Sequence, residues 1–253
     1  MAGFQVVVSS KLSESAPDTL ENQLSNFSNS LQSEIDLEVP FEVAMTQILF
    51  PSEVNNVVDC RLTYFSYALR NVYSSKIPDG YYSSVNMLVT SIQDVLKSSG
   101  DDPYYKISVD PTAKRFIVIT RPPADASMTT PSLVLSPSLK RITGLQDIFT
   151  TGAHVAASAY DLFSACSSLF ALCDIVRPSN FGSSMVPILL VAPFVSSNYA
   201  RQQSFLPIQE HYVPLRTSSI QTLSIKLRNS LGEPFPFSSS GEIVCTLKFR
   251  PLE

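Results

Sequence analysis

The sequence predicts a β-rich protein, and three observations support that prediction. Towards the C-terminal end, apolar and polar residues alternate over residues 220–228 and again over 243–250. A period of two is typical of strands with one face on a core and the other in water. Further short apolar runs are separated by turn residues, among them many of the 18 prolines. Helical spacing is clear only over residues 83–97.

Composition narrows the class of protein. Of 253 residues, 44% are hydrophobic and only 16% are charged, against roughly 25% charged in average soluble domains. A surface so poor in charge favours burial in an assembly, although a secreted β protein with a Ser/Thr surface is the alternative. The net charge of −4 argues against a nucleic-acid-binding surface, which needs a basic patch. This length fits one large domain or two small ones.

No targeting or membrane segment is predicted. The apolar run 4–8 is too short for a signal peptide and no basic residue precedes it. No apolar run reaches about 18 residues, so a transmembrane span is not expected. Cys60, Cys166, Cys173 and Cys245 lie in or beside apolar runs, which favours free buried thiols in a protein made inside the cell and not secreted.

The first half of the chain is expected to be mostly extended. Residues 4–10 contain three consecutive β-branched valines and predict a strand. Residues 20–31 have helical apolar spacing but poor helix formers between the apolar positions, so extended structure is favoured. Residues 59–72 predict one strand or a pair of strands.

The clearest strand of this half is 40–51. Phe41 and Met45 share one parity, whereas Ile48 and Phe50 have the other. Such a change of phase predicts either a bulge or a strand that is buried on both faces.

A turn and a helix follow. Pro78-Asp79-Gly80 is a turn sequence, since proline fixes φ and glycine accepts a left-handed conformation. Residues 83–97 place their apolar residues on one helical face, with Ser83 or Ser84 available as the N-cap and Gly100 as the stop.

The rest of the chain again favours strands. A hairpin is expected over 104–109 and 115–120, and Gly144 is expected to end a short helical turn. Residues 187–195 are almost wholly apolar and predict a strand buried on both faces. Two closing strands, 220–228 and 243–250, are expected to form a hairpin. The short apolar piece between them, 235–237, is expected to be an edge strand or a loop, because Pro234 and Pro236 cannot donate hydrogen bonds to a ladder. The other predicted segments are strands at 133–136 and 169–176 and loops at 150–160 and 196–207.

Several motifs, taken in order, resemble one protein family. The residues that carry the resemblance are I-D-L at 35–37 with F-E-V-A-M-T-Q-I-L-F-P at 41–51, I-P-D-G-Y-Y at 77–82 before the helix, C-D-I-V at 173–176, P-I-L-L-V-A-P at 187–193, Y-V-P-L at 212–215 and L-K-F-R at 247–250. This order, from about residue 35 to 250, resembles the penton (minor capsid) proteins of Polinton/Maverick and adintovirus-like elements. These belong to the adenovirus-like lineage of double-jelly-roll viruses. Aromatic residues that the family has just after Pro51 are missing.

The resemblance implies an all-β fold, a single jelly-roll sandwich over 1–253 with a small helix-and-hairpin insertion at roughly 74–125. It also implies a structural capsid protein that is not an enzyme and whose five copies form a vertex capsomer, or penton. Its partners would be itself, as a homopentamer, and the major capsid protein of the same element. Nucleic acid would not be bound directly, the location would be the virion, and residues 1–18 would be a candidate arm towards a neighbour.

No residue is predicted to be catalytic, to bind a cofactor or to ligate a metal. His154 and His211, the only histidines, have no neighbours at metal-ligand spacing and are expected on the surface. The loop aspartates are expected to be solvated, and paired tyrosines at 81–82 and 104–105 could serve an interface or the core. Two alternatives stay open, a receptor- or glycan-binding jelly-roll module and, less favoured, a cupin-like enzyme. The loop aspartates that are expected to be solvated are Asp101, Asp102, Asp110 and Asp125.

Overall fold

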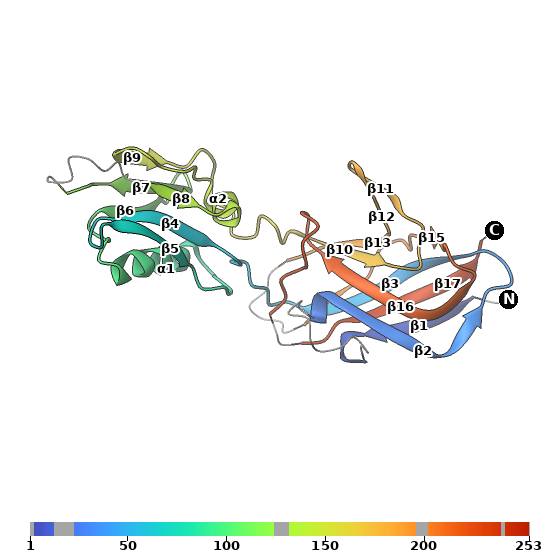
Figure 1. Cartoon of the computed structure of the whole chain (residues 1–253). Coiled ribbons are helices and arrows are strands. Elements are labelled where there is room, and N and C mark those ends of the chain that lie inside the picture. Colours follow the sequence, from blue (N-terminus) through green and yellow to red (C-terminus); the bar gives the residue numbers. More distant parts are fainter. Residues whose placement is uncertain (1–2, 13–22, 124–131, 196–201, 239–240, 253) are drawn as a thin grey trace. The chain divides into compact units, whose positions relative to one another are not determined.

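The chain is described by a computed structural model that covers residues 3–12, 23–123, 132–195, 202–238 and 241–252 (Figure 1). Its contacts divide it into two compact units. The first combines Met1–Val54 with Ala165–Glu253 and is called here the sandwich unit. The second is Asn55–Ser164 and is called the insert unit.

The sandwich unit is built from two antiparallel sheets. The first sheet has the order β1-β17-β3-β14, and a short strand, β15, also pairs with β3. The second sheet has the order β13-β10-β16-β2. The bounds are β1 Phe4–Ser9, β2 Asn26–Asp36, β3 Phe41–Pro51, β10 Ser168–Cys173, β13 Ile188–Pro193, β14 Gln202–Phe205, β15 Val213–Pro214, β16 Ser219–Arg228 and β17 Val244–Pro251.

The order of these strands is that of a jelly roll. If β1, β2, β3, β10, β13, β14, β16 and β17 are counted from one to eight along the chain, the sheets read 1-8-3-6 and 2-7-4-5. This is the double Greek key of an eight-stranded jelly roll. The expected all-β jelly-roll sandwich is therefore confirmed, and the insert unit lies between its third and fourth strands.

The core of the sandwich comes from the alternation seen in the sequence. Leu223 and Ile225 of β16, and Leu247 and Phe249 of β17, are fully buried. The expected closing hairpin is nevertheless wrong, because β16 pairs with β2 and β10, whereas β17 pairs with β1 and β3. The segment 229–243 crosses from one sheet to the other, and alternation alone cannot distinguish a hairpin from such a crossing.

The change of phase in β3 is a β-bulge. Gln47 lies opposite Thr246 and Met45 opposite Leu247, so Thr46 is the extra residue. Its hydroxyl donates to the Thr246 carbonyl at 3.3 Å. Because the bulge resets the parity, apolar residues on both sides of it point into the same core.

Two further expectations for the sandwich unit are wrong. Residues 187–195 are not buried on both faces, because β13 is an edge strand and Val191 is 47% exposed. The expected loop 196–207 contains β14, which pairs with β3, while residues 196–201 lie outside the described part. Of the segment 20–31, which was expected to be extended, residues 26–31 lie in β2, whereas residues 23–25 form a 3-10 turn and residues 20–22 lie outside the described part. Three smaller elements are the hairpin of β11 (Ser179–Phe181) and β12 (Ser184–Val186) and the 3-10 turns at Ser10–Leu12 and Gln23–Ser25.

In its described residues, the insert unit has two three-stranded sheets and two helices around its own core. The sheets have the orders β5-β4-β8 and β6-β7-β9. Buried side chains from both sheets and both helices form a single cluster. The bounds are β4 Arg61–Ser66, β5 Asn71–Lys76, α1 Val85–Ser98, β6 Tyr105–Asp110, β7 Arg115–Thr120, β8 Leu133–Leu135, α2 Pro137–Thr143 and β9 Gly152–Val155.

The local signals in this unit are largely confirmed. Ser84 caps α1 by accepting from the Met87 N–H, and Leu88, Ile92 and Leu96 form its buried stripe. Residues 59–72 contribute a pair of strands, and the hairpin is β6–β7. The expected loop 150–160 is wrong in part, since β9 lies within it and pairs with β7. Glycine and alanine in this segment give no alternation to detect.

Gly144 ends α2 for two reasons. Its φ is +70°, a left-handed conformation, and a Cβ there would lie 2.5 Å from the Ser158 hydroxyl oxygen.

The bounds of the insertion are wider than the expected 74–125. The expected range holds α1 and the β6–β7 hairpin, but β4, β8, α2 and β9 belong to the same compact unit. The early strand and the late elements join through pairing of β4 with β8, a long-range contact that no local signal reveals.

Candidate functional site

The residues first considered for chemistry do not come together as a site. His154 lies on β9 in the insert unit, with Nε2 2.9 Å from the Thr150 carbonyl oxygen, whereas His211 is exposed in the sandwich unit. Asp110 accepts the N–H groups of Thr112 and Ala113 in a hairpin turn. Asp125 lies outside the described residues. Among the residues that the structure describes, no three or more His, Cys, Asp or Glu are grouped so that they could hold a metal ion.

Asp101 was expected to be solvated but is completely buried. Its Oδ1 accepts the backbone N–H groups of Tyr67 at 2.8 Å and Ala68 at 3.2 Å. The side chain thus fastens the turn after β4 to the end of α1. This is a structural role, which the sequence neighbourhood of Asp101 did not indicate.

The four cysteines are free and buried, as the sequence predicted. Burial raises the pKa of the Cys60 thiol to about 11 and that of the Cys173 thiol to about 12. Thiols that stay protonated and out of reach of solvent are poor nucleophiles and poor metal ligands.

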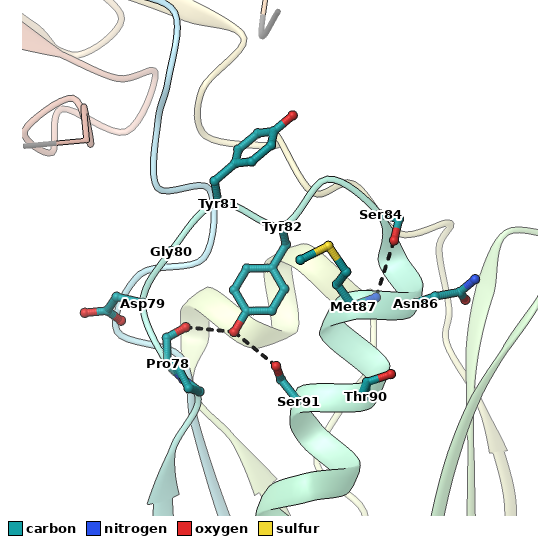
Figure 2. Close-up of a pocket in the computed structure, with 10 residues that line it drawn as sticks. All are labelled: Pro78, Asp79, Gly80, Tyr81, Tyr82, Ser84, Asn86, Met87, Thr90 and Ser91. Carbon is teal, nitrogen blue, oxygen red and sulfur yellow. Dashed lines mark hydrogen bonds between the residues drawn. The ribbon is translucent and has the colours of Figure 1, made fainter. Parts of the chain in front are cut away.

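The described residues include a hollow of about 580 Å³ beside the start of α1, shown in Figure 2. The Tyr82 ring lies between Pro78 and Ser91 of α1. Its hydroxyl donates to the Pro78 carbonyl at 2.9 Å and lies 3.3 Å from the Ser91 hydroxyl. Tyr81 points away from Tyr82. The two hydrogen bonds occupy the Tyr82 hydroxyl, so this hydroxyl is not an activated nucleophile.

An ionic cluster covers part of the outer face of the first sheet. Lys248 on β17 bonds both carboxylate oxygens of Glu210 at 3.0 Å, and the Tyr212 hydroxyl donates to Glu210 at 2.6 Å. These hydrogen bonds lower the pKa of Glu210. The Arg250 guanidinium lies 3.6 Å from the centre of the Tyr212 ring and bonds Glu42 at 2.5 Å. The cluster ties the segment between β14 and β15 to the sheet.

The most distinctive surface is the outer face of the second sheet at its β13 edge. Paired residues of β10 and β13 point outwards together, and the Phe181 ring of the β11–β12 hairpin packs edge-on against Phe170 with 5.0 Å between centroids. Phe181 is 45% exposed and Met185 64% exposed. We call this surface the apolar face. It consists of Phe170, Leu172, Phe181, Met185, Ile188 and Val191.

The surroundings of the apolar face differ sharply along the sheet. On the neighbouring strand, Arg228 lies opposite Phe170 and Lys226 opposite Leu172. Among the described residues neither cation has an ion-pair partner, and Nη1 of Arg228 is buried without an acceptor. Farther across, β16 and β2 present hydroxyl side chains, such as the Ser28–Ser224 pair at 2.8 Å.

Sequence reasoning missed the apolar face because it placed residues 187–195 inside the protein. The signal that could have revealed it is the pair of prolines, Pro187 and Pro193, at the two ends of the run, since proline is confined to strand ends and sheet edges. An apolar strand at an edge exposes one side, which is a feature of interaction surfaces. Neither helix in the described part of the chain has the length and apolar character needed to cross a membrane.

Comparisons with known proteins found a likeness among solved structures. No protein-family model matches the chain, and no curated protein does. Among solved structures, the chain is similar to the crystal structure of the selenomethionine-labelled mavirus penton protein, with 11% sequence identity, a TM-score of 0.44 and coverage of 99% of each chain. The assignment of the jelly roll rests on the strand order of the chain itself.

Proposed function

We propose that this chain is a structural viral capsid protein, a penton, whose homopentamers form vertex capsomers of an icosahedral shell. The observation that carries the proposal is an exposed apolar face on a jelly-roll sandwich, beside two cations that have no ion-pair partner among the described residues. Contiguous apolar surface on a soluble protein marks an interaction site. The sequence motifs that resemble Polinton/Maverick and adintovirus-like pentons, and the low charged fraction of 16%, support the same reading.

The proposed role is assembly and not catalysis. A ring of identical subunits uses two different surfaces of each copy, one for each neighbour, and closes when the rotation between copies is a whole fraction of a turn. The apolar face would serve one such contact or the contact with the major capsid protein of the same element. The net charge of −4 fits a role that does not bind nucleic acid directly, and the location would be the virion.

The first experiment is the mass of the purified protein by light scattering on a sizing column, with negative-stain images of the peak. The proposal expects a particle near five times 27.8 kDa or closed shells of such rings. A monomer at micromolar concentration that also fails to assemble with the major capsid protein would contradict it.

Val191→Asp is expected to prevent assembly, because it places a carboxylate on the apolar face, directly opposite Phe170. A desolvated unpaired charge costs at least about 2 kcal/mol at each contact, so the concentration for half-assembly should rise at least about thirtyfold. Sizing and light scattering measure the change. Thr222→Asp, on the hydroxyl-rich part of the same sheet face, is the matched control and should assemble like the wild type. Equal effects of both variants would mean that the apolar face has no special part in assembly.

A receptor- or glycan-binding module is the second candidate, and the hollow of Figure 2 favours it. Its lining combines Tyr81, Tyr82, Asn86 and Asp79 on and beside one loop, and sugars are commonly held by aromatic rings with polar groups around them. A glycan that binds the wild type but loses at least about tenfold in affinity with Tyr81→Ala, measured by calorimetry, would support this function. Retained affinity would place the ligand elsewhere.

A further inference from the structure

Strand β5 of the insert unit has an open edge. It is the outer strand of the sheet β5-β4-β8, and five of its six residues are exposed. Val72 is 58% exposed and Tyr73 42% exposed, and Leu69 in the preceding turn is 51% exposed. A strand with so little cover is held mainly by its ladder with β4.

The backbone of this edge offers hydrogen-bonding groups. The Ile77 N–H donates to the Cys60 carbonyl at 2.8 Å, which fixes the alternation of the ladder. Tyr73 and Ser75 therefore bond inwards to β4, while the N–H and C=O groups of Ser74 and Lys76 point outwards. Within the described ranges, these outward groups have no partner.

Natural sheets protect such edges with prolines, bulges or charges. The register of β5 with β4 runs without a bulge, and β5 contains no proline. Its single charge, Lys76, is paired with Asp79 at 2.6 Å. The edge is therefore suited to the addition of another strand.

A second open edge lies on the other sheet of the same unit. The Ala156 N–H donates to the Phe116 carbonyl at 2.8 Å, so the backbone groups of Ala153 and Val155 in β9 point away from β7. Val155 is 59% exposed. In Figure 1, β9 and β5 run along opposite sides of the insert unit.

We propose that β5 of one copy pairs with β9 of a second copy and extends its sheet. Ser74 and Lys76 are two residues apart, as are Ala153 and Val155, so one antiparallel register can satisfy both sets of outward groups. Exposed valines on the two strands supply the side-chain contacts. This inference rests on the proposed assembly of identical copies, since a closed ring leaves no edge unpaired whereas an open series leaves one at each end.

Cysteine cross-linking between two single variants tests the pairing directly. Ser74→Cys protein is mixed with Val155→Cys protein under mild oxidation, so that a disulfide between them must join two molecules. Opposed strand residues lie within the Cα separation that a disulfide requires, and the native cysteines are buried. A mixed disulfide, mapped by mass spectrometry and absent with the wild type, is expected. A disulfide only between two Ser74→Cys chains would show that β5 meets β5 and would overturn the proposal.

Ser74→Pro tests the outward backbone bond. It removes the Ser74 N–H, while the inward bonds of Tyr73 and Ser75 stay available. Ser74→Ala is the matched control, because both variants lose the hydrogen bond from the Thr63 hydroxyl to Ser74 (3.0 Å) but alanine keeps the N–H. We expect the proline variant to need about tenfold more protein for half-assembly and the alanine variant to behave like the wild type.

The outcomes separate this inference from the proposed function. If the Ser74→Pro variant still forms rings like the wild type, and the two cysteine variants give no mixed disulfide, the edge pairing is overturned. The capsid role would then remain intact. A wild type that stays monomeric even with the major capsid protein, together with cysteine variants that give no mixed disulfide, would contradict both.

Discussion

Phe235→Ala is expected to lower the free energy of unfolding of the sandwich unit by about 3–5 kcal/mol, the usual cost of emptying a buried phenylalanine site. Phe235 is fully buried, in the segment that carries the chain from β16 in one sheet to β17 in the other. Its ring centroid lies 4.7 Å from that of Phe237 and 5.0 Å from that of Phe194. Alanine would leave a cavity and remove two aromatic contacts, each worth roughly 0.5–1.5 kcal/mol.

Chemical denaturation followed by circular dichroism and tyrosine fluorescence measures this effect. Phe181→Ala is the control, since Phe181 belongs to the same unit but is 45% exposed, and it should cost less than about 1.5 kcal/mol. Because the two units have separate cores, a transition that belongs to the insert unit should not move with Phe235→Ala. If both variants lose a similar free energy of unfolding, the packing of Phe235 against Phe194 and Phe237 has no special part in the stability of the sandwich unit.

Asp101→Ala is expected to destabilise the insert unit by about 3–5 kcal/mol, since it leaves two backbone N–H groups without their charged acceptor. The carboxylate accepts from Tyr67 and Ala68, and the Asp101 carbonyl accepts the N–H groups of Tyr104 and Tyr105. Asp101 therefore joins the turn after β4, the end of α1 and the start of β6. Loss of the side chain frees that turn from the helix.

Asp101→Asn is the informative companion, because the amide keeps one oxygen acceptor at nearly the same place. It should lose roughly half as much stability as the alanine variant. Hydrogen exchange by mass spectrometry locates the effect, which should appear first in β4 and in the turn that follows it. Wild-type protection of this turn in the alanine variant would contradict the assigned role.

Much of the fold could be predicted because its signals are local. The N-cap, stripe and stop of α1 lie within 17 consecutive residues (84–100). The phase change in β3 predicted either a bulge or burial on both faces, and the structure has the bulge. Alternation also identified both faces of β16 and β17. It could not say which strands pair, so the two were expected to form a hairpin although they belong to different sheets.

The candidate surfaces were harder to predict, because each depends on pairing between distant segments. The apolar face exists because β13 is placed at a sheet edge by its single neighbour, β10. The open edge of β9 belongs to a stretch of glycine and alanine with no periodicity. The burial of Asp101 depends on a turn that begins 34 residues earlier. Sequence patterns report the faces of an element but not the element that lies next to it.

The position of the insert unit between the third and fourth strands has a consequence for synthesis on the ribosome. Residues 55–164 are contiguous, so this unit can fold as soon as they have emerged. Strand β3, by contrast, lacks its neighbour β17 until residues 244–251 are made, roughly 10–40 s after β3 itself has been made at translation rates of 5–20 residues per second. During that interval one of the most apolar strands of the sandwich is without its ladder. We expect a nascent chain that is halted just after residue 164 has emerged from the ribosome to combine a folded insert with an unfolded β3 that chaperones can bind.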